Sequence, residues 1–191
     1  MTKIGLYGGS FDPVHLGHLL VAQAAMEETG LARVCFIPAA QSPFKEASRP
    51  ATGALRLQML RLALAGNPAF VVDAQEIERA GISYTIETVR EYGRKYPDCE
   101  LHCLIGADHA RQLPEWHEAG ELAAAARFIV LPRPGQEDRP LTPPFRGCIL
   151  KGFPLALSSS QIRDRVRRGL SIDYLVPSAV AEAIRNNGLY L

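Results

Sequence analysis

Two histidines near the start of the chain, His15 and His18, have the residue type and spacing to do chemistry. They follow the glycine pair Gly8 and Gly9 and stand where a long helical pattern begins. Residues three apart at a helix start share a face, so both imidazoles would lie beside backbone N–H groups that have no partner within the helix. Such a site suits phosphate, and two imidazole donors could stabilise the negative charge on a phosphoryl group in transfer. The competing interpretation is that one histidine caps the helix and the other packs.

The glycines of this stretch match neither of the two common phosphate-binding patterns. No Gly-Lys-Ser/Thr closes the loop, which excludes a Walker A motif. Gly5, Gly8 and Gly9 also miss the Gly-x-Gly-x-x-Gly spacing of a dinucleotide fingerprint. The stretch therefore indicates phosphate binding without matching a generic motif.

The elements that must position this stretch alternate between strand and helix. Short apolar runs predict strands at residues 3–7, 33–37, 70–72, 101–105 and 127–131, with an edge strand at 148–150. Helices are predicted at 16–29, 52–64, 86–95, 118–126, 158–168 and 177–187. This alternation predicts an α/β fold, a doubly wound and mostly parallel sheet in one domain over 1–191, with a C-terminal helical part from about residue 158. Ligands of such sheets bind at the carboxyl ends of strands, where Gly8-Gly9 and Gly106-Ala107-Asp108 both fall.

The balanced net charge means that any binding of anions must depend on local groups of basic residues. The 191 residues carry a formal net charge of +1, so no field of the whole chain favours nucleic acid or anionic lipid. We expect neither a nucleic acid nor a membrane as partner. In the helix at 52–64, Arg56 and Arg61 are expected opposite the face that holds Leu55, Met59, Leu62 and Ala63.

Hydropathy and cysteine usage favour a cytoplasmic protein. No apolar run approaches the ~20 residues of a membrane span, and the N-terminus runs into a strand pattern without a signal-peptide core. The cysteines are scattered, and Cys99 and Cys103 near His102 lack a second pair at a spacing that would complete a zinc site. We therefore expect reduced thiols at Cys35, Cys99, Cys103 and Cys148.

Further motifs follow the first one in order along the chain. Residues 9–18, Gly-Ser-Phe-Asp-Pro-Val-His-Leu-Gly-His, resemble the signature of the nucleotidyltransferase superfamily of the His-x-Gly-His type. After it stand Ser42-Pro43-Phe44-Lys45, Ser83-Tyr84-Thr85, Leu104-Ile105-Gly106-Ala107-Asp108, Leu113-Pro114-Glu115-Trp116 and Leu157-Ser158-Ser159-Ser160-Gln161-Ile162-Arg163. Together these motifs resemble the bacterial nicotinate-nucleotide adenylyltransferases over essentially the whole chain.

The resemblance implies adenylyl transfer from ATP to nicotinate mononucleotide, which gives nicotinate adenine dinucleotide and pyrophosphate in NAD biosynthesis. It places His15 and His18 on the α- and β-phosphates of ATP and Asp108 on the adenosine ribose. By composition alone, Asp108 could equally cap the following helix. The ATP site would also include Gly8, Gly9, Ser10, Phe11 and Gly106.

The helix start near residue 158 would complete the triphosphate site. Ser158, Ser159 and Ser160 would offer hydroxyls and free amides to the anion, and Arg163 could reach it bidentately. Ser158 with Gln161 also fits a capping box, which is a purely structural role. Ser160 departs from the family pattern, in which Thr is expected, but it retains the hydroxyl. The more distal arginines of this helix are expected to form a solvated face.

The resemblance assigns three residues to nicotinate mononucleotide. Lys45 would neutralise its 5′-phosphate, Thr85 would give the pyridine carboxylate a backbone donor, and Trp116 would stack on the nicotinate ring. The alternatives without a binding role are a solvated loop lysine for Lys45 and a buried core residue for Trp116. His117 stands where an aromatic residue is common, which leaves the second wall of the base pocket open.

We expect catalysis by positioning and charge stabilisation, with His15, His18, Arg163 and Lys45 as the catalytic residues. No Ser-His-Asp set supplies a protein nucleophile. Carboxylates are too sparse near the motif for an all-protein cage, so Mg²⁺ is expected to arrive with ATP. Two alternatives stay open, together with the oligomeric state. One is a sister nucleotidyltransferase that uses nicotinamide mononucleotide, phosphopantetheine or a cytidylyl reaction, and the other is a non-catalytic nucleotide-binding module.

Overall fold

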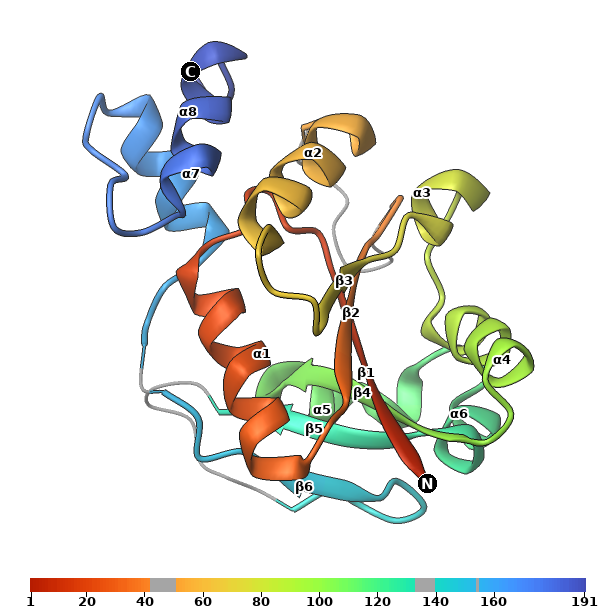
Figure 1. The fold of residues 1–191 in the computed structure, drawn as a ribbon. Coiled ribbons are helices and arrows are strands. Elements are labelled where there is room, and N and C mark those ends of the chain that lie inside the picture. The colour runs from red at the N-terminus through yellow and green to blue at the C-terminus, as the bar shows by residue number, and fades with distance from the viewer. Residues whose placement is uncertain (42–50, 133–139, 154) are drawn as a thin grey trace.

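One parallel sheet forms the centre of the computed structural model, which describes residues 1–41, 51–132, 140–153 and 155–191 (Figure 1). Within these ranges, six strands pair in the order β3-β2-β1-β4-β5-β6, and every neighbouring pair is parallel. The strands are β1 (Thr2–Gly9), β2 (Arg33–Pro38), β3 (Phe70–Val72), β4 (Cys99–Gly106), β5 (Arg127–Leu131) and β6 (Gly147–Ile149). The predicted doubly wound α/β sheet is confirmed.

Helices connect these strands and begin and end close to the predicted positions. Gly30 ends α1 in the left-handed conformation, with φ 70°, and its N–H donates to the Met26 carbonyl at 2.9 Å. The sequence did not predict α3, whose five residues are too few to show a helical period. The helices are α1 (Leu16–Thr29), α2 (Gly53–Leu64), α3 (Gln75–Arg79), α4 (Thr85–Lys95), α5 (Ala107–Gln112), the 3₁₀ turn η1 (Leu113–Glu115), α6 (Ala119–Ala125), α7 (Ser159–Arg167) and α8 (Ser178–Asn186). Among the helices in the described ranges, none has the length and apolar character needed to span a bilayer.

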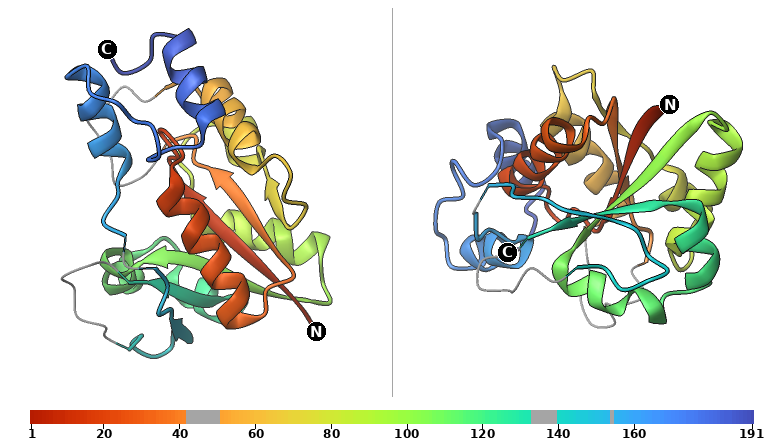
Figure 2. Two further views of the ribbon diagram at one scale, coloured as in Figure 1. Left: turned by 60° about the vertical axis from the view of Figure 1, so that its left-hand side comes forward. Right: turned by 90° about the horizontal axis from the view of Figure 1, so that it is seen from below.

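Helices cover both faces of the sheet (Figure 2), and an apolar cluster of buried side chains lies on each face. Side chains alternate along β1, as the pleat of a strand requires. Ile4 and Leu6 pack with α4 and α6, whereas Tyr7 packs with α1, α2, α7 and α8. Both faces of the central strands are thus buried, which explains their continuous apolar sequences.

The C-terminal helices gather at the carboxyl edge of β1, beside the start of α1 (Figure 1). The carbonyl of Leu175, between α7 and α8, accepts a hydrogen bond from the Leu16 N–H at 3.0 Å. One of the amides left open at the start of α1 is thereby satisfied by a residue far along the chain. The C-terminal part of the chain therefore helps to build the region where the first motif lies.

Candidate active site at the carboxyl edge of the sheet

The first motif lies where the order of the strands reverses. β1 and β4 are neighbours, they run parallel, and the chain leaves them toward opposite sides of the sheet. A Cβ added at Gly8 would meet no atom within 4 Å, so the backbone here borders open space. A Cβ at Gly9 would lie 3.2 Å from the Phe11 ring. One glycine thus leaves room for a ligand, and the other makes room for an aromatic side chain.

The two histidines stack on each other at the start of α1. Their ring centroids are 3.7 Å apart, with 26° between the planes. His15 is the N-cap residue, and its N–H donates to Nδ1 of His18 at 3.2 Å. Because Nδ1 of His18 accepts, the proton of its neutral imidazole is on Nε2. His18 therefore presents a hydrogen-bond donor, as binding to a phosphate oxygen requires.

Burial decides the charge of this pair. His15 is only 5% exposed. Loss of hydration lowers the pKa of His15 to about 4, against a smaller opposing effect of a backbone hydrogen bond. At neutral pH the stack therefore does not hold two positive charges, and a neutral His15 imidazole has one ring N–H with which it can donate. Both roles of the competing interpretation are present, since His15 is the N-cap residue and the two rings pack on each other. These contacts fix the position of one ring relative to the other.

Aromatic side chains pack against the ring of His18. Phe11 is 1% exposed and meets Tyr7 edge-on at 5.4 Å and His18 at 5.0 Å between centroids. The Phe11 ring lies in the core, so the ATP contact expected of this residue falls to its backbone, which has φ 45°. A Cβ at Gly17 would lie 3.0 Å from Nδ1 of His15, so the glycine between the histidines permits the close approach of this ring.

The start of α7 is tied directly to the loop that carries the motif. Ser159 Oγ donates to the Pro13 carbonyl at 2.9 Å, and Arg163 Nη1 donates to the Asp12 carbonyl at 2.7 Å. Arg163 also donates to Ser160 Oγ at 3.1 Å. The guanidinium is therefore held beside the loop that precedes His15. The structure brings together two regions that are about 150 positions apart in the sequence.

Ser158 caps α7. Its hydroxyl accepts from the Gln161 N–H at 3.3 Å, while its own N–H donates to Gln161 Oε1 at 2.8 Å. This is the reciprocal capping box that was the structural alternative for this residue. The hydroxyls of Ser159 and Ser160 also have protein partners. The Ser160 hydroxyl only accepts from Arg163, so its own O–H can still donate to an anion, whereas the Gln161 N–H is already used by the cap.

Arg56 corrects the sequence analysis. The residue was expected opposite the apolar face of α2, yet it is 3% exposed, and Leu62, expected on the apolar face, is 37% exposed. The guanidinium donates from Nε to Ala51 O at 3.0 Å and from Nη1 to Ser10 O at 3.0 Å and to Ala39 O at 2.7 Å. Burial lowers the pKa of Arg56, and the negative charge of Asp12 opposes that effect. Periodicity missed this role because two of the three acceptors, Ser10 O and Ala39 O, come from loops elsewhere in the sequence.

The residues assigned to the nucleosides lie on neighbouring segments at the same edge. Asp108 is in the first turn of α5, directly after Gly106 ends β4, and Thr85 is the first residue of α4. Tyr84 stacks on His117 with 4.3 Å between centroids and 33° between the planes. This contact brings the Trp116-His117 pair next to Thr85. The sequence left the role of His117 open, and here its ring stacks on that of Tyr84.

Trp116 is half-buried and packs against the core layer under α4 and α6. Its ring meets His109 at 6.2 Å, nearly edge-on. Lys45, with the rest of Ser42-Pro43-Phe44-Lys45, lies outside the described residues. The chain that leads into that segment is attached to the motif at Thr85, since Ala40 N–H donates to Ser83 Oγ and Ser83 N–H to Gln41 O, both at 3.0 Å.

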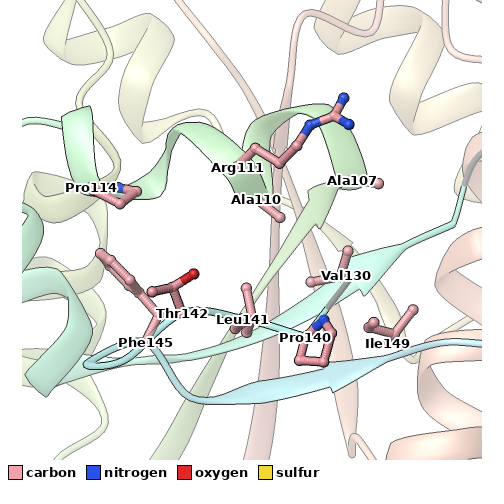
Figure 3. A pocket seen from close by; sticks show the side chains of 10 residues that line it. All are labelled: Ala107, Ala110, Arg111, Pro114, Val130, Pro140, Leu141, Thr142, Phe145 and Ile149. Carbon is pink, nitrogen blue, oxygen red and sulfur yellow. The ribbon is translucent and has the colours of Figure 1, made fainter. Parts of the chain in front are cut away.

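A separate hollow lies beneath α5, between that helix and the segment that includes β6 (Figure 3). Its lining is largely apolar, with Leu141, Phe145 and Val130 on its walls. It contains none of the residues that the sequence assigned to ATP or to nicotinate mononucleotide. The donors suited to phosphate lie instead around the stacked histidines and the start of α7.

Known proteins resemble this chain both in sequence and in fold. A family model described as cytidylyltransferase-like matches residues 6–165. A protein of Herpetosiphon aurantiacus named "probable nicotinate-nucleotide adenylyltransferase" is 41% identical over 198 residues, covering 100% of both chains. A protein of the same name from Opitutus terrae is 43% identical over 190 residues, covering 98% of this chain and 97% of its own. The solved Plasmodium falciparum nicotinic acid mononucleotide adenylyltransferase in complex with NaAD has a TM-score of 0.82 at 16% identity, covering 100% of this chain and 98% of that one, and this likeness concerns the fold.

Proposed function

The chain belongs to the nicotinate-nucleotide adenylyltransferase family, and on that premise we propose how its residues transfer the adenylyl group of ATP to nicotinate mononucleotide. The products of the reaction are nicotinate adenine dinucleotide and pyrophosphate. The observation that carries the proposal is the stacked histidine pair at the start of α1, with Nε2 of His18 as a donor, next to Arg163 and the first turn of α7.

The reaction is an in-line displacement at phosphorus. An oxygen of the mononucleotide 5′-phosphate attacks the α-phosphorus of ATP, a new P–O bond forms, and the bond to the bridging oxygen of the β-phosphate breaks. The electron pair of that bond leaves with pyrophosphate. The attacking oxygen is already anionic, so the step requires no protein nucleophile and no general base.

The protein contributes position and charge stabilisation. His18 donates from Nε2 and His15 donates as a neutral imidazole to oxygens of the α- and β-phosphates, where negative charge increases in the transition state. Arg163 and the amides of the first turn of α7 hold the departing phosphates. The backbone at Gly8 leaves space for the triphosphate to approach the end of β1.

The remaining contacts follow from the position of each residue. Asp108 accepts from the ribose hydroxyls of ATP, and the backbone at Gly106 lies beside it. Trp116, with the Tyr84–His117 stack, forms the flat pocket for the pyridine ring, and the Thr85 N–H at the start of α4 donates to its carboxylate. Lys45 is assigned to the 5′-phosphate on the motif alone.

A divalent cation enters as part of the substrate. Within the ranges that the structure describes, no three His, Cys, Asp or Glu side chains are grouped as ligands for a metal ion. Mg²⁺ that bridges the phosphates of ATP would neutralise their charge and orient them.

The thiols of Cys35, Cys99, Cys103 and Cys148 are free, which supports a reducing compartment and hence a cytoplasmic location.

Pyrophosphate release from a panel of substrates tests this function. Purified protein with Mg²⁺ is given ATP or CTP together with nicotinate mononucleotide, nicotinamide mononucleotide or phosphopantetheine. We expect the highest kcat/KM with ATP and nicotinate mononucleotide. A higher value for another pair would establish the sister-transferase alternative, and ATP binding without turnover on any acceptor would establish a non-catalytic module.

A further inference from the structure

The penultimate residue of the chain reaches the loop between β1 and α1. Tyr190 donates from its hydroxyl to Asp12 Oδ1 at 2.6 Å, across 178 positions of sequence. The same carboxylate oxygen accepts from the Ala51 N–H at 3.1 Å, and Asp12 is 4% exposed. The contact is therefore a partly buried hydrogen bond, from a half-buried tyrosine to a buried carboxylate, and hydrogen bonds to charged groups are among the stronger types in proteins.

The backbone of Tyr190 adopts an unfavourable conformation where this contact forms. Its φ is 67°, in the left-handed region, which is unfavourable for a residue with a Cβ. The ring also packs against the apolar cluster to which α1, α2, α7 and α8 contribute side chains. The surrounding contacts must outweigh the backbone cost, so the placement of the hydroxyl is specific and is not the drift of a loose terminus.

Asp12 connects this hydroxyl to the arginine of the active site. While the Asp12 side chain accepts from Tyr190, its backbone carbonyl accepts from Arg163 Nη1 at 2.7 Å. One residue thus receives a hydrogen bond from the C-terminal turn and another from the guanidinium assigned to the departing phosphates. If the Asp12 peptide rotates, the position of Arg163 changes with it.

We propose that Tyr190 is a positioning residue for adenylyl transfer, which acts through Asp12 to hold the guanidinium of Arg163 in its productive place. The proposal rests on the proposed function of this site. It does not require Tyr190 to touch either substrate. The stabilisation that Tyr190 contributes through Arg163 is larger in the transition state than in the bound substrates, because the negative charge near Arg163 increases as pyrophosphate departs.

A second tyrosine that donates to a carboxylate provides a matched control. Tyr92, on α4, donates from its hydroxyl to Asp73 Oδ2 at 2.5 Å. Asp73 lies just beyond β3 and accepts from both nitrogens of Gln75. Tyr92→Phe therefore removes the same type of bond as Tyr190→Phe, a partly buried bond from a tyrosine hydroxyl to a carboxylate. No residue around Tyr92 and Asp73 has an assigned role in the transfer.

The first experiment compares steady-state kinetics of the two variants with those of the wild-type full chain. For Tyr190→Phe we expect kcat to fall about tenfold, with the KM for ATP within about twofold of wild type. Tyr92→Phe should keep kcat within about twofold, while both variants lose a similar few degrees in Tm. The proposal is overturned if Tyr190→Phe keeps its kcat, or if both variants lose kcat equally.

The second experiment asks whether the effect passes through Arg163. The Tyr190→Phe change is made in an Arg163→Ala background, and kcat is compared with that of Arg163→Ala alone. A positioning residue has nothing left to position there, so the further loss should be less than about twofold. An additional tenfold loss would show that Tyr190 acts independently and would refute the proposed path. Absence of turnover in the wild type would instead refute the function itself, so the two failures are distinguishable.

Discussion

The neutral state of buried His15 makes the stability of the fold depend on pH in a way that one substitution isolates. Burial lowers the pKa of His15 to about 4 in the folded chain, from 6.5 when it is free in solution. Below pH 6.5 the unfolded chain therefore binds a proton that the folded chain does not, so stability falls as the pH falls and levels off below pH 4. Integrating between the two pKa values gives a loss of about 2 kcal/mol by pH 5 and about 3 kcal/mol at the limit.

The assay is urea unfolding of wild type and His15→Asn from about pH 7.5 to pH 5. Other groups also titrate in this range, since burial lowers the pKa of His102 and raises that of Glu76. Their contributions are common to both proteins and cancel in the difference. We expect the free energy of unfolding of wild type minus that of the variant to fall by about 2 kcal/mol between these two pH values. A difference that stays flat, or that rises on acidification, would refute the inference that burial keeps this imidazole neutral.

Three substitutions test the site itself. His18→Ala should lower kcat by about 100-fold or more with the circular dichroism spectrum unchanged, because it removes a donor to the transferring phosphoryl group; near-normal turnover would exclude that role. Trp116→Ala should raise the KM for nicotinate mononucleotide about tenfold and leave the KM for ATP alone, and the reverse pattern would reassign the pocket. Gly17→Ala should lower kcat about tenfold, since its Cβ would lie 3.0 Å from Nδ1 of His15. Gly93→Ala in α4, where a Cβ meets nothing within 4 Å, is the control and should keep full activity with about 0.5–1 kcal/mol of added stability.

Local patterns determined most of the helices and strands and the histidine pair of the candidate site, whereas the resemblance to a known family supplied the residues assigned to the nucleosides. The bounds of α1 follow from its apolar spacing and from Gly30, and the strands follow from short apolar runs. The pairing of His15 with His18 follows from a spacing of three at a helix start. These features depend on residues close to one another in the chain, so periodicity and spacing contain the information that specifies them.

Tertiary structure decided the charge and the support of those residues. The neutral state of His15 depends on how completely the surrounding elements bury it, which no local pattern measures. Arg56 is polar by type and appeared to belong opposite the apolar face of α2, but three backbone carbonyls, two of them from loops distant in sequence, make its burial favourable. The bond between Tyr190 and Asp12 joins the two ends of the chain. The sequence determined which groups this protein has for phosphate chemistry, whereas only the packing of distant segments fixed their protonation and their positions, because desolvation and hydrogen-bond partners are properties of the folded whole.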